Sequence, residues 1–229
     1  MLLTKNQEIL KSFISSKNIQ YLYHFTPLEN VKSILKYGIF NRDLVDVCIR
    51  NGSVIKVTDQ ERFENARWAI CCSISWINNK MLYVKEQNLG LTFAILELDI
   101  EILYIYNCVF TPKNAASADM RLLIQQFRQK DSKLDQIKTL FSDNQSLDIF
   151  FPDNVQSEVL VDTEKIDVKY IRKIHVRNAA HQRQLIDDSI HPELITISKK
   201  LFYNRPLKQE LLDLQELLAF DDEDWNTIL

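Results

Sequence analysis

Glycine is scarce in this sequence, with three residues among 229. The phosphate-binding loops of P-loop proteins and of dinucleotide-binding folds both need several glycines within a few positions. The sequence therefore excludes both kinds of loop. A nucleotide phosphate bound by this chain would have to be held by side chains or by the N-terminus of a helix.

Histidine and cysteine are also few, four of each, and neither is spaced like a metal site. The cysteines lack the paired spacing of zinc ligands, and four in 229 residues do not make a disulfide framework. No two histidines stand four residues apart, and the motifs G-x-S-x-G and H-E-x-x-H are absent. We therefore expect neither a metal site nor a hydrolase triad.

Long hydrophobic runs are missing as well. No stretch approaches the roughly 18 apolar residues that a transmembrane helix requires. The first 20 residues lack an apolar segment that ends at a small-residue cleavage site. We expect a cytoplasmic protein that is neither embedded in a membrane nor exported.

The net charge of −3 conceals an uneven distribution. Residues 206–229 contain seven acidic residues and one lysine, a net charge of −6, so residues 1–205 carry +3. The body is mildly basic, which permits nucleic-acid binding without establishing it. We expect one domain over residues 1–200, followed by a C-terminal helix and acidic tail over residues 201–229.

The clearest local pattern is a strand followed by a helix. Residues 19–25 alternate and are rich in aromatic side chains, which indicates a strand. Thr26, Pro27 and Glu29 then match the N-cap, N1 and N3 positions of a helix start. Gly38 stands where such a helix would end.

The remaining patterns predict an α+β fold, because the strands do not alternate regularly with helices. We expect residues 40–64 to form a long loop and residues 81–86 a short helical turn. Further strands are predicted at residues 69–76, 91–98, 102–110, 155–161 and 171–176. Further helices are predicted at residues 2–15, around 120–127, at 178–189 and at 208–218.

Several polar residues are candidates for a site, but each also has an ordinary explanation. His24 suits a core histidine, Thr26 a helix cap, and Arg62 a solvated charge in a loop. On a strand over residues 155–161, Gln156 and Glu158 would share one face. That face fits either a functional site or the solvated side of an edge strand.

Five segments, taken in order, resemble segments of the DarT-type ADP-ribosyltransferase toxins that modify DNA bases. Ile77 stands where that family has proline, and Ser157 where it has alanine. No counterpart is found beyond about residue 175. The five segments are YLYHFT at 21–26 with the helix that follows, Arg62 with CCSIS at 71–75, NNKMLY at 78–83, FTPKNAAS at 110–117, and VQSEVLV at 155–161.

The resemblance implies an NAD⁺-cleft fold, with two small, roughly orthogonal β-sheets flanked by helices. It assigns Glu158 as the carboxylate that stabilises an oxocarbenium-like ribose, as the carboxylates of glycosidases do. Arg62 would bind phosphate and orient the dinucleotide. The other residues that the resemblance assigns to NAD⁺ are His24 on the adenosine ribose, Thr26 near the nicotinamide, Phe25 and Tyr83.

The same resemblance assigns a second set of residues to the acceptor. We expect the acceptor to be a base of single-stranded DNA, because a base must leave its stack to enter a cleft. The alternatives are an RNA or protein acceptor, or a catalytically dead nucleic-acid-binding module. The acceptor residues are Asn78, Lys80, Asn114, Ser117 and Gln156.

The resemblance also implies a biological setting. The chain would be a toxin or a phage-defence enzyme that consumes NAD⁺ as a co-substrate, without a metal, and releases nicotinamide. A cognate antitoxin that reverses the modification or binds the toxin would be its partner. From its charge and its apolar stripe, the C-terminal segment would cover the acceptor groove, bind that partner, or simply be a packed helix with a solvated end.

Overall fold

A computed structural model describes residues 3–58, 66–130, 132–141 and 151–203 of the chain. Two of the expectations lie outside these residues: Arg62, and the helix at 208–218 with its acidic tail. Within the described ranges, no helix combines the length and apolar character needed to cross a membrane.

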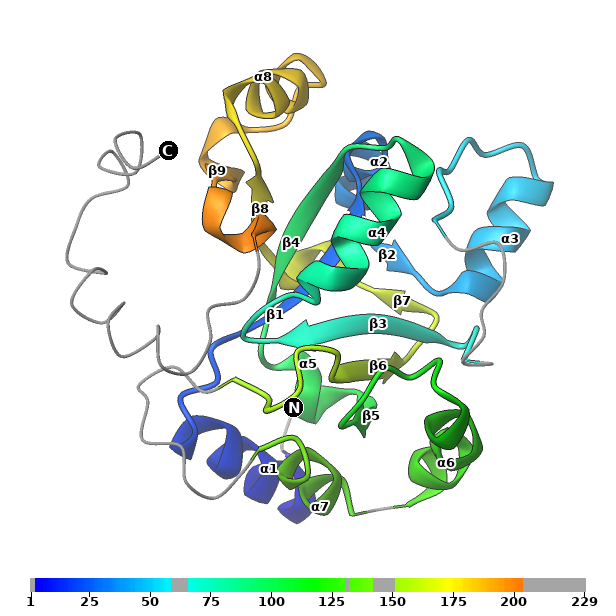
Figure 1. The fold of residues 1–229 in the computed structure, drawn as a ribbon, viewed down its shortest axis with the longest axis vertical. Coiled ribbons are helices and arrows are strands. Elements are labelled where there is room, and N and C mark those ends of the chain that lie inside the picture. Colours follow the sequence, from blue (N-terminus) through cyan, green and yellow to red (C-terminus); the bar gives the residue numbers. More distant parts are fainter. Residues whose placement is uncertain (1–2, 59–65, 131, 142–150, 204–229) are drawn as a thin grey trace.

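Seven strands of the described chain form one mixed sheet in the order β5-β6-β3-β1-β4-β8-β9 (Figure 1). Neighbours in this sheet are antiparallel, except that β8 and β9 are parallel. A two-stranded sheet pairs β2 (Ile39–Phe40) with β7 (Lys165–Ile166). The large sheet consists of β1 (Tyr21–Pro27), β3 (Ala69–Ile74), β4 (Phe93–Asp99), β5 (Asn107–Thr111), β6 (Glu158–Asp162), β8 (Ile171–Val176) and β9 (Ile195–Ile197).

The large sheet has two halves with different strand directions. Figure 1 shows β3 and β6 running across the direction of β1 and β4. The halves join where β1 pairs with β3 through two positions, Leu22 with Ile74 and Tyr23 with Ser73. The α+β class is confirmed. The two roughly orthogonal sheets that were predicted are the two halves of one continuous sheet.

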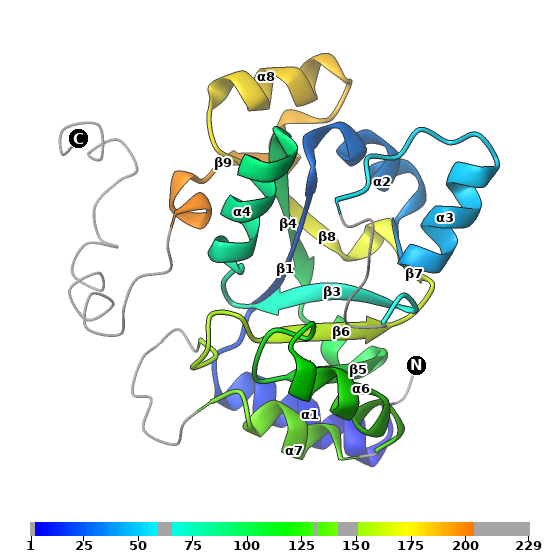
Figure 2. The same ribbon diagram turned by 45° about the vertical axis from the view of Figure 1, so that its right-hand side comes forward.

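Helices surround both halves of this sheet (Figures 1 and 2). α1 and α7 lie together beside β5, and α8 lies at the opposite end of the molecule. The α-helices are α1 (Lys5–Ser16), α2 (Val31–Tyr37), α3 (Arg42–Arg50), α4 (Asn79–Leu89), α5 (Ile102–Ile105), α6 (Ala118–Gln129), α7 (Lys133–Lys138) and α8 (Ala179–Asp187). Short 3₁₀ helices are η1 (Leu28–Asn30), η2 (Val168–Tyr170), η3 (Pro192–Leu194) and η4 (Lys199–Phe202).

Strand β4 lies at the centre of the core. It pairs with β1 on one edge and with β8 on the other, and all seven of its residues are buried. Its nearly uninterrupted apolar sequence suits a strand that is covered on both faces. Glu97 and Asp99 are the exceptions: the Glu97 carboxylate lies 3.0 Å from Nε2 of the buried His175, and Asp99 forms an ion pair with Arg172.

The interpretation of Thr26 as a helix cap is wrong. β1 continues through Thr26 and Pro27, which pair with Ala94 and Phe93 of β4. The helical turn begins one residue later than expected, at Leu28 with Pro27 at its N-cap, and has no side-chain cap hydrogen bond. The Thr26 oxygen instead accepts a hydrogen bond from the Asn30 side chain at 3.4 Å.

Other predicted boundaries also need correction. Residues 40–64 are not all loop, because α3 starts there with Asn41 as its N-cap. The turn at 81–86 is part of the longer α4, and the strand at 102–110 is α5 followed by β5. The strand at 155–161 begins only at Glu158, so Gln156 precedes it rather than sharing its face.

Gly38 ends α2 as expected. Its φ of +93° is a conformation that other residues rarely adopt. A Cβ atom at this position would lie 2.5 Å from the carbonyl oxygen of Ile166 in β7. Glycine therefore serves both to end the helix and to let the chain approach the small sheet.

Candidate active site

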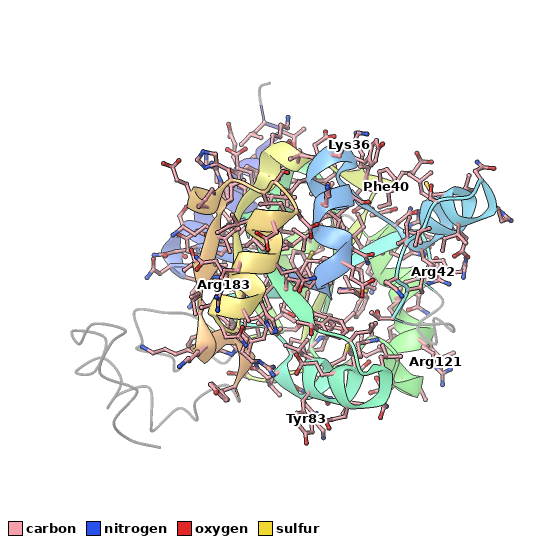
Figure 3. The ribbon with its side chains drawn as sticks, turned by 90° about the horizontal axis from the view of Figure 1, so that it is seen from above. Lys36, Phe40, Arg42, Tyr83, Arg121 and Arg183 are labelled. Carbon is pink, nitrogen blue, oxygen red and sulfur yellow. The ribbon has the colours of Figure 1, made fainter. Side chains whose placement is uncertain are left out.

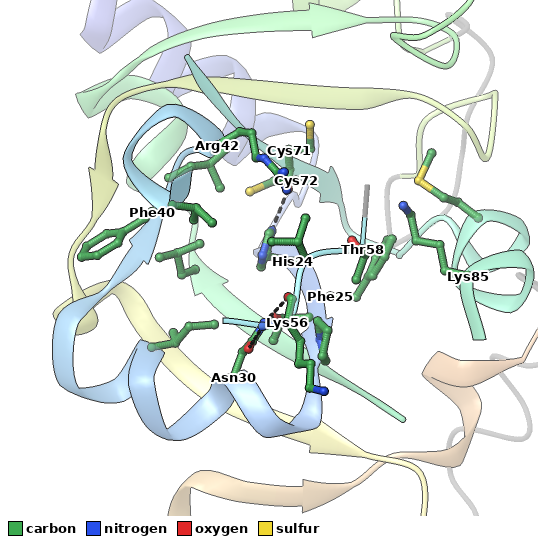
Figure 4. A pocket seen from close by; sticks show the side chains of 18 of the residues that line it. His24, Phe25, Asn30, Phe40, Arg42, Lys56, Thr58, Cys71, Cys72 and Lys85 are labelled. Carbon is green, nitrogen blue, oxygen red and sulfur yellow. Dashed lines mark hydrogen bonds between the residues drawn. The ribbon is translucent and has the colours of Figure 1, made fainter. Parts of the chain in front are cut away.

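A cavity of about 1080 Å³ opens at the junction of the two halves of the sheet. Its walls come from β1 and α2, residues 53–58, β3, α4, and the segments around residues 114–116 and 156–158. Figure 4 shows side chains from several of these elements turned toward one space. The cavity thus collects residues that lie far apart in the sequence.

Strand β1 contributes His24, Phe25 and Thr26 to the lining. The His24 Nδ1 atom lies 2.8 Å from the carbonyl oxygen of Cys71 on β3 (Figure 4). Because a carbonyl can only accept, Nδ1 carries the proton in this bond. In the neutral ring, Nε2 is then an acceptor for a donor such as a ribose hydroxyl.

Glu158 is the first residue of β6, and it lines the cavity although only 8% of it is exposed. Its Oε2 atom accepts a hydrogen bond of 2.9 Å from the backbone amide of Ala115. The Thr111 hydroxyl donates to the Glu158 carbonyl at 3.2 Å. The carboxylate is therefore oriented by the segment that leads from β5 to α6.

The N-terminus of α4 meets the cavity. Asn78 caps this helix by accepting from the Met81 amide at 3.1 Å, and Asn78, Lys80 and Met81 all line the cavity. The partial positive charge of a helix N-terminus adds to the charge of Lys80. This side of the cavity suits an anionic group.

Tyr83 lies further along α4 and is not part of the lining. Its side chain is 62% exposed, and Figure 3 shows it on the outer side of the helix. Ser117 also lies outside the lining, since its hydroxyl donates to the Asp119 carboxylate at the start of α6. The structure does not bring these two predicted residues into the cavity.

The cavity does contain Asn114 and Gln156, on the same side as Glu158. The Asn114 side chain accepts from the Ala116 amide at 2.8 Å, so the 114–116 turn is locally fixed. Of the residues predicted for the site, the described chain places eight in the lining. They are His24, Phe25, Thr26, Asn78, Lys80, Asn114, Gln156 and Glu158.

Sequence reasoning missed further polar residues of the lining, among them Asn30, Arg42, Lys56 and Lys85. Arg42 stands in the first turn of α3, where its Nε atom lies 2.8 Å from the Asp46 carboxylate. The Asn41 cap was the signal that could have revealed this helix. Asn30 and Lys56 had no such local signal, because they meet across 26 residues.

The charges of the lining are strongly unequal. Among the described residues, Glu158 is the one carboxylate of the lining, whereas Arg42, Lys56, Lys80 and Lys85 supply four cations. The described part of the chain holds no cluster of three or more His, Cys, Asp or Glu arranged for a metal ion. These charges suit an anionic ligand, one part of which contacts the single buried carboxylate.

A comparison with known protein families assigns the chain to one of them. The family model described as "ssDNA thymidine ADP-ribosyltransferase, DarT" matches residues 23–203. The chain belongs to the DarT family. The match includes all eight predicted residues of the lining, as well as Arg62.

A solved DarTG structure is similar in fold. Thermosipho africanus DarTG in complex with ADP-ribose has a TM-score of 0.53 and 16% identity, over 82% of this chain and 53% of that chain. The chain thus spans about half the length of that protein. Thermus sp. 2.9 DarT in complex with NAD⁺ has a TM-score of 0.49 and 12% identity, over 80% of this chain and 97% of that chain. The same Thermus protein in complex with ADP-ribosylated ssDNA has a TM-score of 0.48 and 14% identity, with coverages of 80% and 96%. A search of curated proteins gives no match.

Proposed function

We propose that this chain transfers ADP-ribose from NAD⁺ to the thymine base of a thymidine in single-stranded DNA and releases nicotinamide. The observation that carries the proposal is the position of Glu158. It is the one carboxylate of the described lining, it is nearly buried, and it lies in a DarT-family cavity otherwise rich in cations.

The transfer breaks the bond between the ribose C1′ and the nicotinamide nitrogen, and nicotinamide leaves with the bonding electron pair. Positive charge develops on the ribose as this bond lengthens. The Glu158 carboxylate stabilises that charge, and the Ala115 amide keeps the carboxylate in place. The base then bonds to C1′, and the proton of its attacking group passes to solvent.

The cations of the lining are suited to the two phosphates of NAD⁺. The resemblance assigns phosphate binding to Arg62, and the N-terminus of α4 adds its partial positive charge, in place of a glycine-rich loop. His24 accepts from the adenosine ribose through Nε2, and Thr26 faces the nicotinamide. Phe25 stays among the NAD⁺ contacts, whereas the position of Tyr83 outside the lining gives no support to such a role.

The acceptor enters from the side of Gln156 and Asn114. Their side-chain amides can both donate to and accept from the edge of a thymine. Asn78 and Lys80 complete the acceptor side, and Lys80 has the charge needed to meet a DNA phosphate. A base in a duplex would have to be extruded before it could enter, which favours a single strand.

We further propose that the enzyme acts in the cytoplasm as a toxin or in phage defence, with a cognate antitoxin as partner. The resemblance of its motifs to DarT-type toxins supports this setting. Residues 1–200 would form the catalytic domain, and residues 201–229 would bind the antitoxin or cover the acceptor groove.

An acceptor competition tests the proposal. The protein is incubated with NAD⁺ and a mixture of single-stranded DNA, duplex DNA, RNA of matching sequence and unrelated protein. Mass spectrometry then locates the adduct. We expect ADP-ribose on the single-stranded DNA. An adduct found mainly on RNA or protein would show that one of these is the acceptor and that single-stranded DNA is not. Nucleic-acid binding without any transfer would show that the chain is only a binding module.

A further inference from the structure

Residues 53–58 form one wall of the cavity without belonging to a helix or strand. The segment starts just after α3, where the Ser53 amide donates to the Cys48 carbonyl at 3.0 Å. Irregular backbone next to a binding cavity needs partners for its polar groups, or it will not keep one conformation. How this wall is held therefore bears directly on the shape of the cavity.

The backbone of Lys56 finds both its donor and its acceptor partner in a single side chain. Asn30 Nδ2 donates to the Lys56 carbonyl at 2.8 Å, and Asn30 Oδ1 accepts from the Lys56 amide at 3.0 Å (Figure 4). A carboxamide can do both at once, so it pairs with this residue as a neighbouring strand would. We name this pair of bonds the Asn30 clasp.

The Asn30 clasp connects two parts of the cavity wall. Asn30 is 9% exposed and ends η1, and its Nδ2 atom also lies 3.4 Å from the Thr26 hydroxyl on β1. It therefore joins the 53–58 wall to the strand that carries His24. The other link, between Lys56 Nζ and Glu29 at 3.7 Å, is solvent-exposed and contributes little.

We propose that Asn30 is a positioning residue for NAD⁺, which holds the 53–58 wall at the correct distance from β1 so that the cavity fits the dinucleotide. The inference rests on the proposed function. It assigns Asn30 to binding and not to bond cleavage, because the Glu158 carboxylate is oriented separately, by Ala115.

The Asn30→Ala variant tests this role. It removes both bonds of the clasp, so the KM for NAD⁺ is expected to rise about tenfold while kcat stays within about twofold. Hydrogen exchange at the Lys56 amide is expected to accelerate in the free enzyme, since its acceptor is gone. The nearly isosteric Asn30→Asp keeps an acceptor for the Lys56 amide and loses the donor to its carbonyl. It should give an intermediate KM.

Asn178→Ala is the matched control. Asn178 caps α8 through one hydrogen bond to the His181 amide and lies outside the cavity lining. Its loss should lower the melting temperature without changing the KM for NAD⁺. Asn30 would be merely structural if both Asn30 variants lowered the melting temperature and left KM unchanged. A fall in kcat at unchanged KM would also overturn the inference.

The wild-type protein separates this inference from the proposed function. If the wild type binds and consumes NAD⁺ while both Asn30 variants do so with unchanged KM, only the role of Asn30 is lost. If the wild type neither binds nor consumes NAD⁺, the proposed function fails, and the role of Asn30 in NAD⁺ binding fails with it. Exchange at the Lys56 amide would then still report whether the clasp exists.

Discussion

The Glu158 carboxylate accepts a hydrogen bond from the Ala115 backbone amide, 2.9 Å away across the gap between β6 and the segment before α6. A backbone donor cannot be exchanged by mutation of its side chain, and Ala115 is itself buried. The hydrogen bond fixes the position of one carboxylate oxygen, Oε2, at the wall of the cavity. The orientation of this carboxylate therefore depends on the backbone of the fold and not on a neighbouring side chain.

Glu158→Gln is expected to fold normally and to lose transfer by about 10²–10³-fold in kcat. The glutamine oxygen can still accept from Ala115, so the side chain keeps its place while its charge is lost. Thermal melting and nicotinamide release measure the two effects. Glu193→Gln, at an exposed site outside the lining, is the control. A transfer rate within a few-fold of wild type would show that Glu158 does not take part in the reaction.

Arg62→Ala is expected to raise the KM for NAD⁺ and to leave the melting temperature nearly unchanged. Arg62→Lys retains the charge but not the two-point contact that a guanidinium makes with phosphate, so its KM should be intermediate. Steady-state kinetics and thermal melting of both variants check this. A collapse of the melting temperature in Arg62→Ala would make Arg62 structural.

Thr26→Val tests whether Thr26 belongs to strand β1 and does not cap the helix that follows. No backbone amide of the helix uses the Thr26 oxygen, and valine suits a strand, so the expected loss is below about 0.5 kcal/mol. Thr4→Val is the matched comparison, because Thr4 does cap α1 by accepting from the Gln7 amide. That variant should lose about 1 kcal/mol of unfolding free energy. Equal losses in urea denaturation would restore Thr26 as a cap.

Gly38→Ala and Gly52→Ala separate a steric clash from backbone strain. Both glycines have positive φ, +93° and +89°, but only at Gly38 would a Cβ meet a backbone oxygen within 4 Å. Gly52→Ala should therefore cost about 1 kcal/mol, and Gly38→Ala about 3 kcal/mol or more. Urea denaturation measures the difference. Similar losses would show that β7 moves away without cost.

The sequence predicted those elements whose signals are local. The apolar runs of β3, β4 and β8 and the glycine that ends α2 were all recognisable in short windows. Helix α3 was missed because its apolar residues are only partly covered, as Val47 and Ile49 show at 40% and 38% exposure. The helix is amphipathic but short, with nine residues, and none of them is buried, so its segment resembles a polar loop in sequence.

The errors around the site have a tertiary cause. Thr26 has the residue type of a cap, but pairing with β4 extends the strand through it, and such pairing overrides local preference. The motifs that resemble DarT located part of the lining, since eight of the predicted residues meet in the cavity. Asn30 could not be predicted, because its partner lies 26 residues away in a segment without a pattern.

The central claim is that thymidine in single-stranded DNA receives ADP-ribose from NAD⁺. Its most direct test uses two single-stranded oligonucleotides that differ at one position, one with a single thymidine and one with cytidine in its place. After incubation with the enzyme and NAD⁺, intact-mass spectrometry is expected to show the mass of one ADP-ribosyl group added to the thymidine oligonucleotide alone, with one nicotinamide released per adduct. Equal modification of both oligonucleotides, or of neither, would contradict the account.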